Sequence, residues 1–83
     1  MKLIVYTKAD CPLCDEGLRE VQVVAERYGL EIEKVDVEGD SELFYTHRYR
    51  IPVVEFGGEE LGWGRLDAGA MARRLAGRLP GPE

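Results

Sequence analysis

Segments of different hydrophobic periodicity follow one another along this chain and predict alternating strands and helices. The run from Leu3 to Tyr6 is continuously apolar, which is typical of a central strand covered on both faces. From Pro12 onward, apolar residues recur at steps of three and four: Leu18, Val21, Ala25 and Tyr28. This stripe predicts a helix with one buried face that ends at Gly29.

A second strand is expected over residues 30–37, where the alternation of apolar and polar positions slips near Glu33 and Lys34. Either a bulge or a position at the edge of the sheet would explain this slip. Strand, helix and strand at this spacing form a βαβ unit. Its two strands are therefore expected to pair in parallel through a right-handed crossover.

Glycine and proline delimit the elements that follow. Residues 39–41 (Gly-Asp-Ser) predict a turn and an N-cap for a short helix carrying Leu43 and Phe44. That helix must stop before Pro52, which opens a third strand over residues 52–56. The pair Gly57-Gly58 predicts a two-residue hairpin. Residues 59–63 should then return antiparallel as a fourth strand, with two glutamates on an exposed edge.

A last helix is expected after Asp67, which is a candidate N-cap. Its inner face is marked by Met71, Leu75 and Leu79. Three arginines near its C-terminal end complement the helix dipole, so we assign them a structural role: Arg73, Arg74 and Arg78. Residues 80–83 (Pro-Gly-Pro-Glu) predict a flexible tail, which leaves one domain over residues 1–79.

The only two cysteines, Cys11 and Cys14, stand where the first strand hands over to the first helix. This C-x-x-C spacing places both sulfurs on one face of the first helical turn, close enough to form a disulfide. The helix N-terminus favours an anion, so Cys11 should be rich in thiolate while Cys14 stays more shielded. Pro12 suits the first helical position and stiffens the turn. Gly17 is either a tolerated helical glycine or packs closely against this active-site loop.

Other readings of the cysteine pair remain open. The cysteines could be ordinary small hydrophobic residues, or half of a metal site. A tetrahedral zinc site needs about four ligands, and only His47 is at hand besides carboxylates. The strand-to-helix context favours redox chemistry, with Cys11 as the nucleophile and Cys14 as the resolving thiol.

Length and charge narrow the class of protein. Eighty-three residues make one small domain, and the formal net charge of −5 argues against nucleic-acid or anionic-membrane partners. The N-terminus shows no signal peptide and no apolar stretch has membrane-spanning length. We therefore expect a cytoplasmic monomer, and in a reducing compartment a cysteine pair is more often catalytic than structural.

The residues T-K-A-D-C-P-L-C-D-E, R-I-P-V-V and W-G-R-L-D, in this order of elements, resemble the glutaredoxins. They resemble more closely a family of small, largely uncharacterised bacterial glutaredoxin-like proteins. This resemblance covers nearly the whole chain. It implies the α/β thioredoxin fold, with a four-stranded mixed sheet in the order 2-1-3-4 and three flanking helices on both faces.

The resemblance also implies roles for individual residues. Cys11 matches the attacking cysteine and Cys14 the resolving one. Pro52 matches the family's cis-proline, which leaves the backbone of Ile51 free to pair with an extended substrate. Lys8 matches a lysine that helps bind a glutathione carboxylate and lowers the thiolate pKa; a solvated loop lysine is the alternative.

The turn Gly62-Trp63-Gly64-Arg65 departs from the family pattern. Glutaredoxins usually carry a Gly-Gly pair followed by acidic residues there, and that segment grips the γ-glutamyl end of glutathione. Only Asp67 could replace the acidic cap, and its register is shifted. We therefore expect dithiol chemistry with protein disulfides but a weakened glutathione site.

Several further residues have two possible roles. Trp63 could line a substrate groove or close the edge of the core, the commoner role for an aromatic residue at a strand end. His47 could donate a proton or bind a ligand, but a lone histidine on a short polar helix is expected to be solvated. Arg48 and Arg50 flank the proline loop and could hold a substrate carboxylate or support the thiolate. Asp15 and Glu16 should temper the fall in the pKa of Cys11.

The leading hypothesis is a small thiol–disulfide oxidoreductase that needs no bound cofactor. Its partners would be protein disulfides, with glutathione or a thioredoxin reductase as the reductant. Lys8, Pro12, Arg50, Ile51, Pro52 and Trp63 are the expected substrate-binding residues. One alternative is a metal or iron–sulfur carrier in which two chains each contribute a cysteine pair, which Pro12 disfavours. Another is a thioredoxin-fold module that donates electrons to one fixed partner protein.

Overall fold

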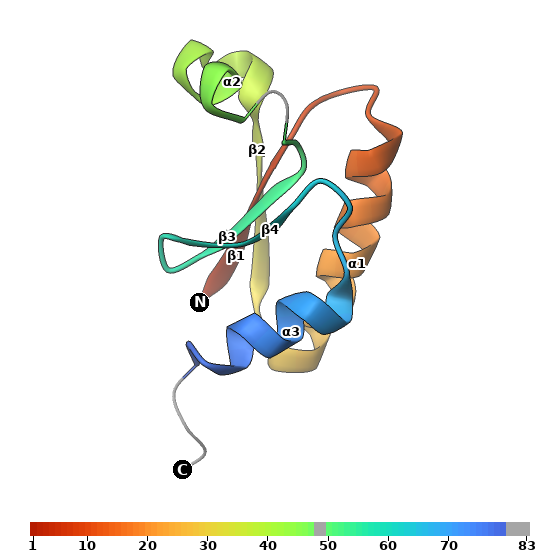
Figure 1. The fold of residues 1–83 in the computed structure, drawn as a ribbon, viewed down its shortest axis with the longest axis vertical. Helices are drawn as coiled ribbons and strands as arrows, with labels where there is room; N and C mark the ends of the chain where they lie inside the picture. The colour runs from red at the N-terminus through yellow and green to blue at the C-terminus, as the bar shows by residue number, and fades with distance from the viewer. Residues whose placement is uncertain (48–49, 80–83) are drawn as a thin grey trace.

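Four strands form a mixed sheet in the order β2-β1-β3-β4 (Figure 1). They are β1 (Lys2–Thr7), β2 (Glu31–Asp36), β3 (Val53–Phe56) and β4 (Glu59–Trp63). Strand β1 pairs with β2 in parallel and with β3 antiparallel, and β3 pairs antiparallel with β4. The computed structural model describes residues 1–47 and 50–79. Arg48 and the expected tail at residues 80–83 therefore lie outside the described residues. The predicted strand order is confirmed.

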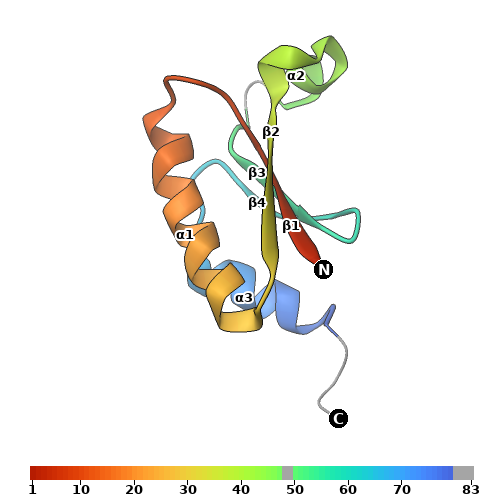
Figure 2. The same ribbon diagram turned by 180° about the vertical axis from the view of Figure 1, so that it is seen from behind.

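Helices α1 (Pro12–Tyr28) and α3 (Ala68–Ala76) cover one face of the sheet and pack against each other (Figure 2). The alternate residues Leu3 and Val5 of β1 point to this face. They join a core that draws on both helices and three strands: Val21, Val24, Ala25, Val54, Phe56, Leu61, Leu66, Met71 and Leu75. Val24 was not part of the predicted stripe of α1, whereas Leu18 of that stripe is only half-buried.

Helix α2 (Ser41–His47) follows a short 3₁₀ helix, η1 (Val37–Gly39), that the hydrophobic pattern did not predict. Asp40 caps α2, because its carboxylate accepts hydrogen bonds from the backbone N–H groups of Glu42 and Leu43. The helix lies beyond the end of β2 and away from α1 and α3 (Figure 1). Its last residue, His47, reaches the sheet face that these two helices leave uncovered.

His47 corrects an expectation, because it is not solvated. Its side chain is buried, with 7% of the residue exposed, and its ring stacks on Tyr6 with 4.5 Å between the ring centroids. Leu43 and Phe44 stand four and three positions before His47 and pack against the cluster around Cys14, so the helical period places His47 on the apolar face of α2. The stacking partner comes from β1, far away in the sequence, so periodicity on α2 could not predict it.

The turns form where the sequence placed them. Gly29 ends α1 with a φ of 66°, and the hairpin residues Gly57 and Gly58 have φ values of 59° and 82°. These left-handed conformations favour glycine and fit the tight hairpin between β3 and β4. Asp67 caps α3 as expected, since its carboxylate accepts a hydrogen bond from the N–H of Ala70.

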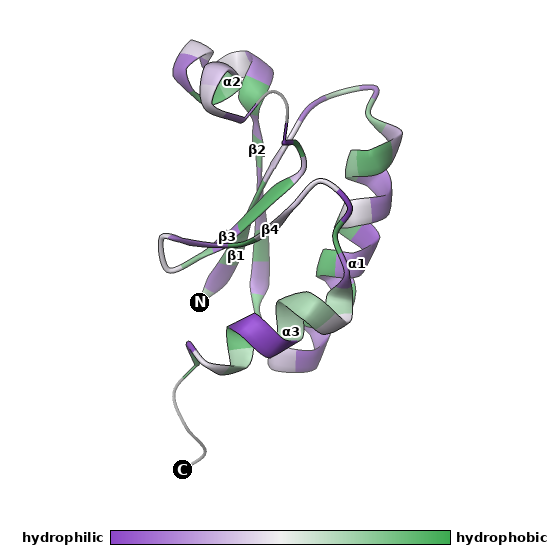
Figure 3. Cartoon of the chain, in the orientation of Figure 1, coloured by the Kyte–Doolittle hydropathy of each residue, from purple (hydrophilic) through white to green (hydrophobic). Residues whose placement is uncertain are grey.

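The irregular alternation in β2 comes from its position at the edge of the sheet, while its pairing with β1 runs without a shift from Lys2–Glu31 to Thr7–Asp36. The register irregularity lies instead between β3 and β4, at Val54 and Glu55. Hydrophobic residues fill the middle of the sheet, and the helices carry alternating polar and apolar bands (Figure 3). In the described part of the chain, no helix is long and apolar enough to cross a membrane.

Candidate functional site: a disulfide at a helix N-terminus

Cys11 and Cys14 form a disulfide, with their Cα atoms 5.1 Å apart. Cys11 is the N-cap of α1 and has extended backbone angles, whereas Pro12 occupies the first turn, where a missing N–H is harmless. The N–H of Cys14 donates to the Cys11 Sγ at 3.1 Å. After reduction, the same donor and the positive end of the helix dipole would stabilise a thiolate on Cys11.

The two sulfurs differ in their access to solvent. Cys14 is 3% exposed and belongs to a small apolar cluster with Val37 and Ile51. Cys11 is half-buried and only packs against the rim of that cluster. Cys14 is therefore the more shielded of the two cysteines, as expected from the C-x-x-C spacing at a helix N-terminus.

The Ile51-Pro52 peptide bond is cis, which confirms the expectation drawn from the resemblance. Pro52 is almost completely buried, and a Cβ built on Gly17 of α1 would lie 2.8 Å from its Cγ. The same atom would lie 2.9 Å from Leu66 Cδ1. Gly17 is therefore a close-packing glycine, because any larger side chain would push the proline loop away from α1.

The proline loop is fixed on its other side by the start of the turn after β4. The N–H of Gly64 donates to the carbonyl oxygens of both Arg50 and Pro52, at 2.9 and 2.8 Å. The N–H of Arg50 in turn donates to the carbonyl of His47 at 2.8 Å. Between these anchored residues, the backbone of Ile51 makes no hydrogen bond within residues 1–47 and 50–79. Its N–H and C=O groups can thus pair with an added polypeptide strand.

Trp63 stands on the surface beside this loop. It is 52% exposed, so the interpretation as a closing residue of the core is wrong. The Arg50 guanidinium lies 4.8 Å from the centre of the Trp63 ring, and its Nη2 donates to Glu60 Oε2. The Arg50 cation over the ring and the Glu60 carboxylate next to that cation stabilise the position of the indole on the surface, outside the core.

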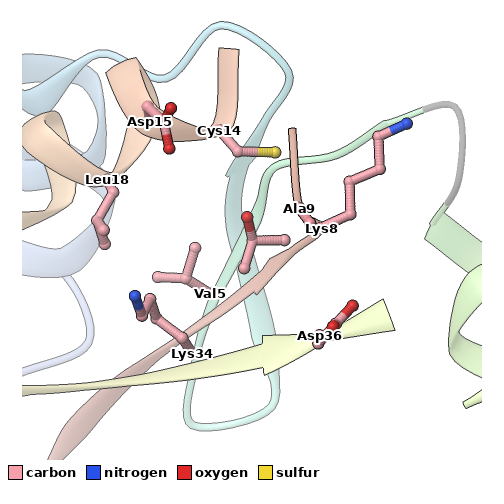
Figure 4. Close-up of a pocket in the computed structure, with 9 residues that line it drawn as sticks. Val5, Lys8, Ala9, Cys14, Asp15, Leu18, Lys34 and Asp36 are labelled. Carbon is pink, nitrogen blue, oxygen red and sulfur yellow. The ribbon is translucent and has the colours of Figure 1, made fainter. Parts of the chain in front are cut away.

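A pocket of about 320 Å³ lies on the other side of the cysteine pair, between α1 and the ends of β1 and β2 (Figure 4). Its lining includes Cys14 and four charged residues, Lys8, Asp15, Lys34 and Asp36. Lys8 extends outward, away from the sulfur of Cys14 (Figure 4). Cys11 does not line this pocket, so the pocket reaches Cys14 and not Cys11.

Tyr6 connects the apolar cluster around Cys14 with the open face of the sheet. Its hydroxyl donates to Glu55 Oε1 at 2.9 Å. Burial, followed by this hydrogen bond and the charge of Glu55, raises the pKa of Tyr6 above its ordinary value. The phenol therefore stays neutral and serves as a structural link between β1, β3 and the buried His47 ring.

Residues 2–76 match the model of one protein family, the Glutaredoxin-like domain (DUF836). The chain belongs to this family. Together with the disulfide at the start of α1, membership fits a role in thiol redox chemistry.

Solved structures of similar chains agree with the glutaredoxin-like assignment. An X-ray structure of a structural-genomics target protein from X. campestris shares 29% identity with a TM-score of 0.76, over 90% of this chain and 96% of that chain. A protein from Nitrosomonas europaea, solved by NMR, shares 27% identity with a TM-score of 0.74, over 88% of both chains. Thioredoxin 1 from Thermosipho africanus, at 18% identity and a TM-score of 0.61 over 94% and 98% of the chains, shares the fold. The glutaredoxin-like chain therefore has the thioredoxin fold.

The structure divides the expected site residues between the two sides of the cysteine pair. Pro12, Ile51 and Pro52 lie with the cysteines, and Arg50 and Trp63 lie beside the proline loop. Lys8 lines the pocket on the other side. The sequence reasoning missed Glu60, which pairs with Arg50, and the Tyr6–His47 stack. For the pairing of Arg50 with Glu60, the sequence offered only a basic residue ten positions before an acidic one. In the part of the chain that is described, no three His, Cys, Asp or Glu side chains could hold a metal ion together.

Proposed function

We propose that this glutaredoxin-like protein is a dithiol thiol–disulfide oxidoreductase that reduces disulfides in other proteins. The observation that carries the proposal is the unequal exposure of the two sulfurs of one disulfide at the N-terminus of α1. The less buried sulfur, that of Cys11, has the N–H donor and the helix dipole that stabilise a thiolate. The buried sulfur, Cys14, is placed to attack it from within the same turn.

The reaction starts from the reduced protein. The Cys11 thiolate attacks one sulfur of the substrate disulfide, the substrate S–S bond breaks, and the second substrate sulfur leaves as a thiolate. Cys14 then loses its proton and attacks the Cys11 sulfur of the mixed disulfide. The remaining substrate sulfur leaves, so the substrate gains two electrons and the Cys11–Cys14 disulfide forms. A thiol reductant, glutathione or a thioredoxin reductase, returns the protein to its dithiol state.

The substrate is proposed to dock as an extended segment along the proline loop. The unpaired backbone groups of Ile51 supply hydrogen bonds, and the exposed Pro12 supplies apolar contact next to the sulfurs. Pro52 is itself buried and holds the Ile51 backbone in place. Lys8 and the pocket near Cys14 lie on the opposite side of the cysteine pair. We place the activity in the cytoplasm, because a dithiol reductase needs a reducing compartment.

Trapping of the mixed disulfide tests this proposal. The reduced Cys14→Ser variant should form a stable mixed disulfide with a disulfide-containing test protein, because the resolving thiol is missing. The wild type should instead release reduced test protein and become oxidised. The Cys11→Ser variant should do neither, since the buried Cys14 is a poor nucleophile for a large substrate.

Mass spectrometry of tryptic peptides identifies the linked cysteine. Limited alkylation of the reduced wild type supplies a second readout, and Cys11 should be labelled before Cys14. Equal trapping by both single variants, or faster labelling of Cys14, would contradict the assigned roles.

A further inference from the structure

Trp63, Arg50 and Glu60 form a surface cluster that redox chemistry at the sulfurs does not explain. An indole with half of its surface exposed costs free energy in water unless a partner covers it. It is the only tryptophan of the chain, and it stands where β4 ends opposite Val53, one residue before Gly64. The Gly64 N–H binds the carbonyls on both sides of Ile51. The cluster is therefore attached directly to the backbone on which we propose that the substrate docks.

The guanidinium of Arg50 has capacity for a further anion. Its Nη2 binds Glu60, while Nε and Nη1 have no partner among residues 1–47 and 50–79. An arginine presents five donors and binds a second carboxylate readily. Its side chain is 38% exposed and its position over the indole is fixed, so little freedom is lost when an anion binds.

Charges of both signs lie on each side of the disulfide. Lys8 and Lys34 line the pocket near Cys14 together with Asp15 and Asp36, whereas Arg50 and Glu60 pair beside the proline loop. The net charge of −5 disfavours acidic partners at long range. A preference for an acidic group must therefore arise from direct contact with Arg50.

On the basis of the proposed function, we propose that Arg50 and Trp63 select the polypeptide segment next to the substrate cysteine. The favoured segment carries an acidic side chain that binds the free edge of Arg50, and its aliphatic part packs on the Trp63 ring. Glu60 weakens this selection, because it competes for the same guanidinium. The partner is thus a protein disulfide with Asp or Glu close to the attacked cysteine.

Two matched peptides test the selection. Each carries one cysteine as its 2-pyridyl disulfide, and they differ only in Glu or Gln beside that cysteine. The reduced Cys14→Ser protein attacks the peptide sulfur, forms the Cys11–peptide disulfide and releases 2-thiopyridone, whose absorbance gives the rate. We expect the Glu peptide to react about 2- to 5-fold faster at low salt, the range for an exposed charge pair. The ratio should fall towards one at high salt.

Two substitutions in the same Cys14→Ser background should change the rate ratio in opposite directions. Arg50→Gln should abolish the preference for the Glu peptide, whereas Glu60→Gln should increase it, because it frees the guanidinium. The matched control is Lys2→Gln, which removes one positive charge at the far end of β1 and should leave the ratio unchanged. The fluorescence of Trp63 should change when the Glu peptide is bound in the mixed disulfide, and less when the Gln peptide is bound.

The outcomes separate this inference from the proposed function. If neither peptide reacts, the thiol chemistry itself is wrong. Equal rates for the two peptides, or a parallel response of the Arg50→Gln and Glu60→Gln variants, would overturn the selection by Arg50 and leave the oxidoreductase intact. Loss of folding in Arg50→Gln would show in its circular dichroism, and the Glu60→Gln variant then decides the question.

Discussion

Gly17 of α1 and Pro52 of the proline loop pack closely because Gly17 has no side chain. A Cβ at position 17 would lie 2.8 Å from Pro52 Cγ, closer than carbon atoms approach in folded proteins. Helix α1 therefore carries the disulfide at its start and supports the proline loop one turn later. This contact, together with the hydrogen bonds from Gly64 and the packing of Ile51 against Cys14, sets the position of the Ile51 backbone next to the cysteines.

The Gly17→Ala variant tests that dependence. An alanine inside a helix normally stabilises it by about 1 kcal/mol relative to glycine. Here the added methyl group must displace a buried proline and Leu66, at a cost of about 1–3 kcal/mol. We expect the free energy of unfolding in urea to fall by up to about 2 kcal/mol, and the reduction of a protein disulfide to slow. Gly39→Ala is the control, because no atom lies within 4 Å of its added Cβ. A Gly17→Ala variant as stable and active as the wild type would show that the contact is unimportant.

A second prediction concerns the buried ring of His47. Replacement by alanine removes the stack on Tyr6 and leaves a cavity, so we expect a loss of about 1–3 kcal/mol in the free energy of unfolding. The His47→Phe variant keeps an aromatic ring and should recover most of this loss. Ser41→Ala, at the exposed start of the same helix, should change stability little. Thermal and urea unfolding followed by circular dichroism measure all three. Equal losses for alanine and phenylalanine would mean that the imidazole nitrogens, not the stack, stabilise this site.

The local signals in the sequence predicted most of the fold, because strands, caps and turns depend on neighbouring residues. Gly29, Gly57 and Gly58 mark left-handed turns, and Asp67 caps its helix, each within a few positions of the signal. The errors at His47 and Trp63 have another origin. Their environments are created by Tyr6 and Arg50, which lie 41 and 13 positions away and come close only in the folded chain.

In the candidate site too, features set by neighbouring residues could be predicted and contacts between distant residues could not. The cysteine pair is local, so its position at a helix N-terminus could be predicted from spacing alone. The cis bond before Pro52 was predicted through family resemblance, since an X-Pro bond is trans by default. The pairing of Arg50 with Glu60 could not be predicted, because it joins a loop residue before β3 to a residue of β4 ten positions away.

A third prediction follows from the raised pKa of Tyr6. The unfolded chain loses the phenolic proton near the ordinary value of 10.0, whereas the folded protein keeps it to higher pH. The unfolded state then binds fewer protons, so stability falls as pH rises from about 10 through the higher folded pKa. Below pH 10 this contribution is fully present. We expect the wild type to lose stability relative to Tyr6→Phe as the pH rises above 10, measured by urea unfolding of the oxidised protein. A difference between the two proteins that does not change with pH would contradict the role of burial and Glu55.

The last prediction concerns glutathione. The turn after β4 carries Arg65 where glutaredoxins usually have acidic residues, and only Asp67 remained as a candidate to receive the charged amine of glutathione. The carboxylate of Asp67 accepts a hydrogen bond from the N–H of Ala70 at 2.8 Å, as the cap of α3. Binding an amine would compete with this cap, which contributes about 1 kcal/mol to the helix.

We therefore expect poor turnover of a small glutathionylated substrate, although protein disulfides are reduced. One missing charge-assisted contact corresponds to about 1.5–3 kcal/mol, or roughly 10- to 150-fold in affinity. The assay couples glutathione release to glutathione reductase for the wild type and for Cys14→Ser, with an ordinary glutaredoxin as the reference. The Arg65→Asp variant restores an acidic side chain in the turn and should raise the rate, whereas Arg27→Asp, at the far end of α1, should not. Robust activity of both the wild type and Cys14→Ser would show that the glutathione site tolerates the altered turn.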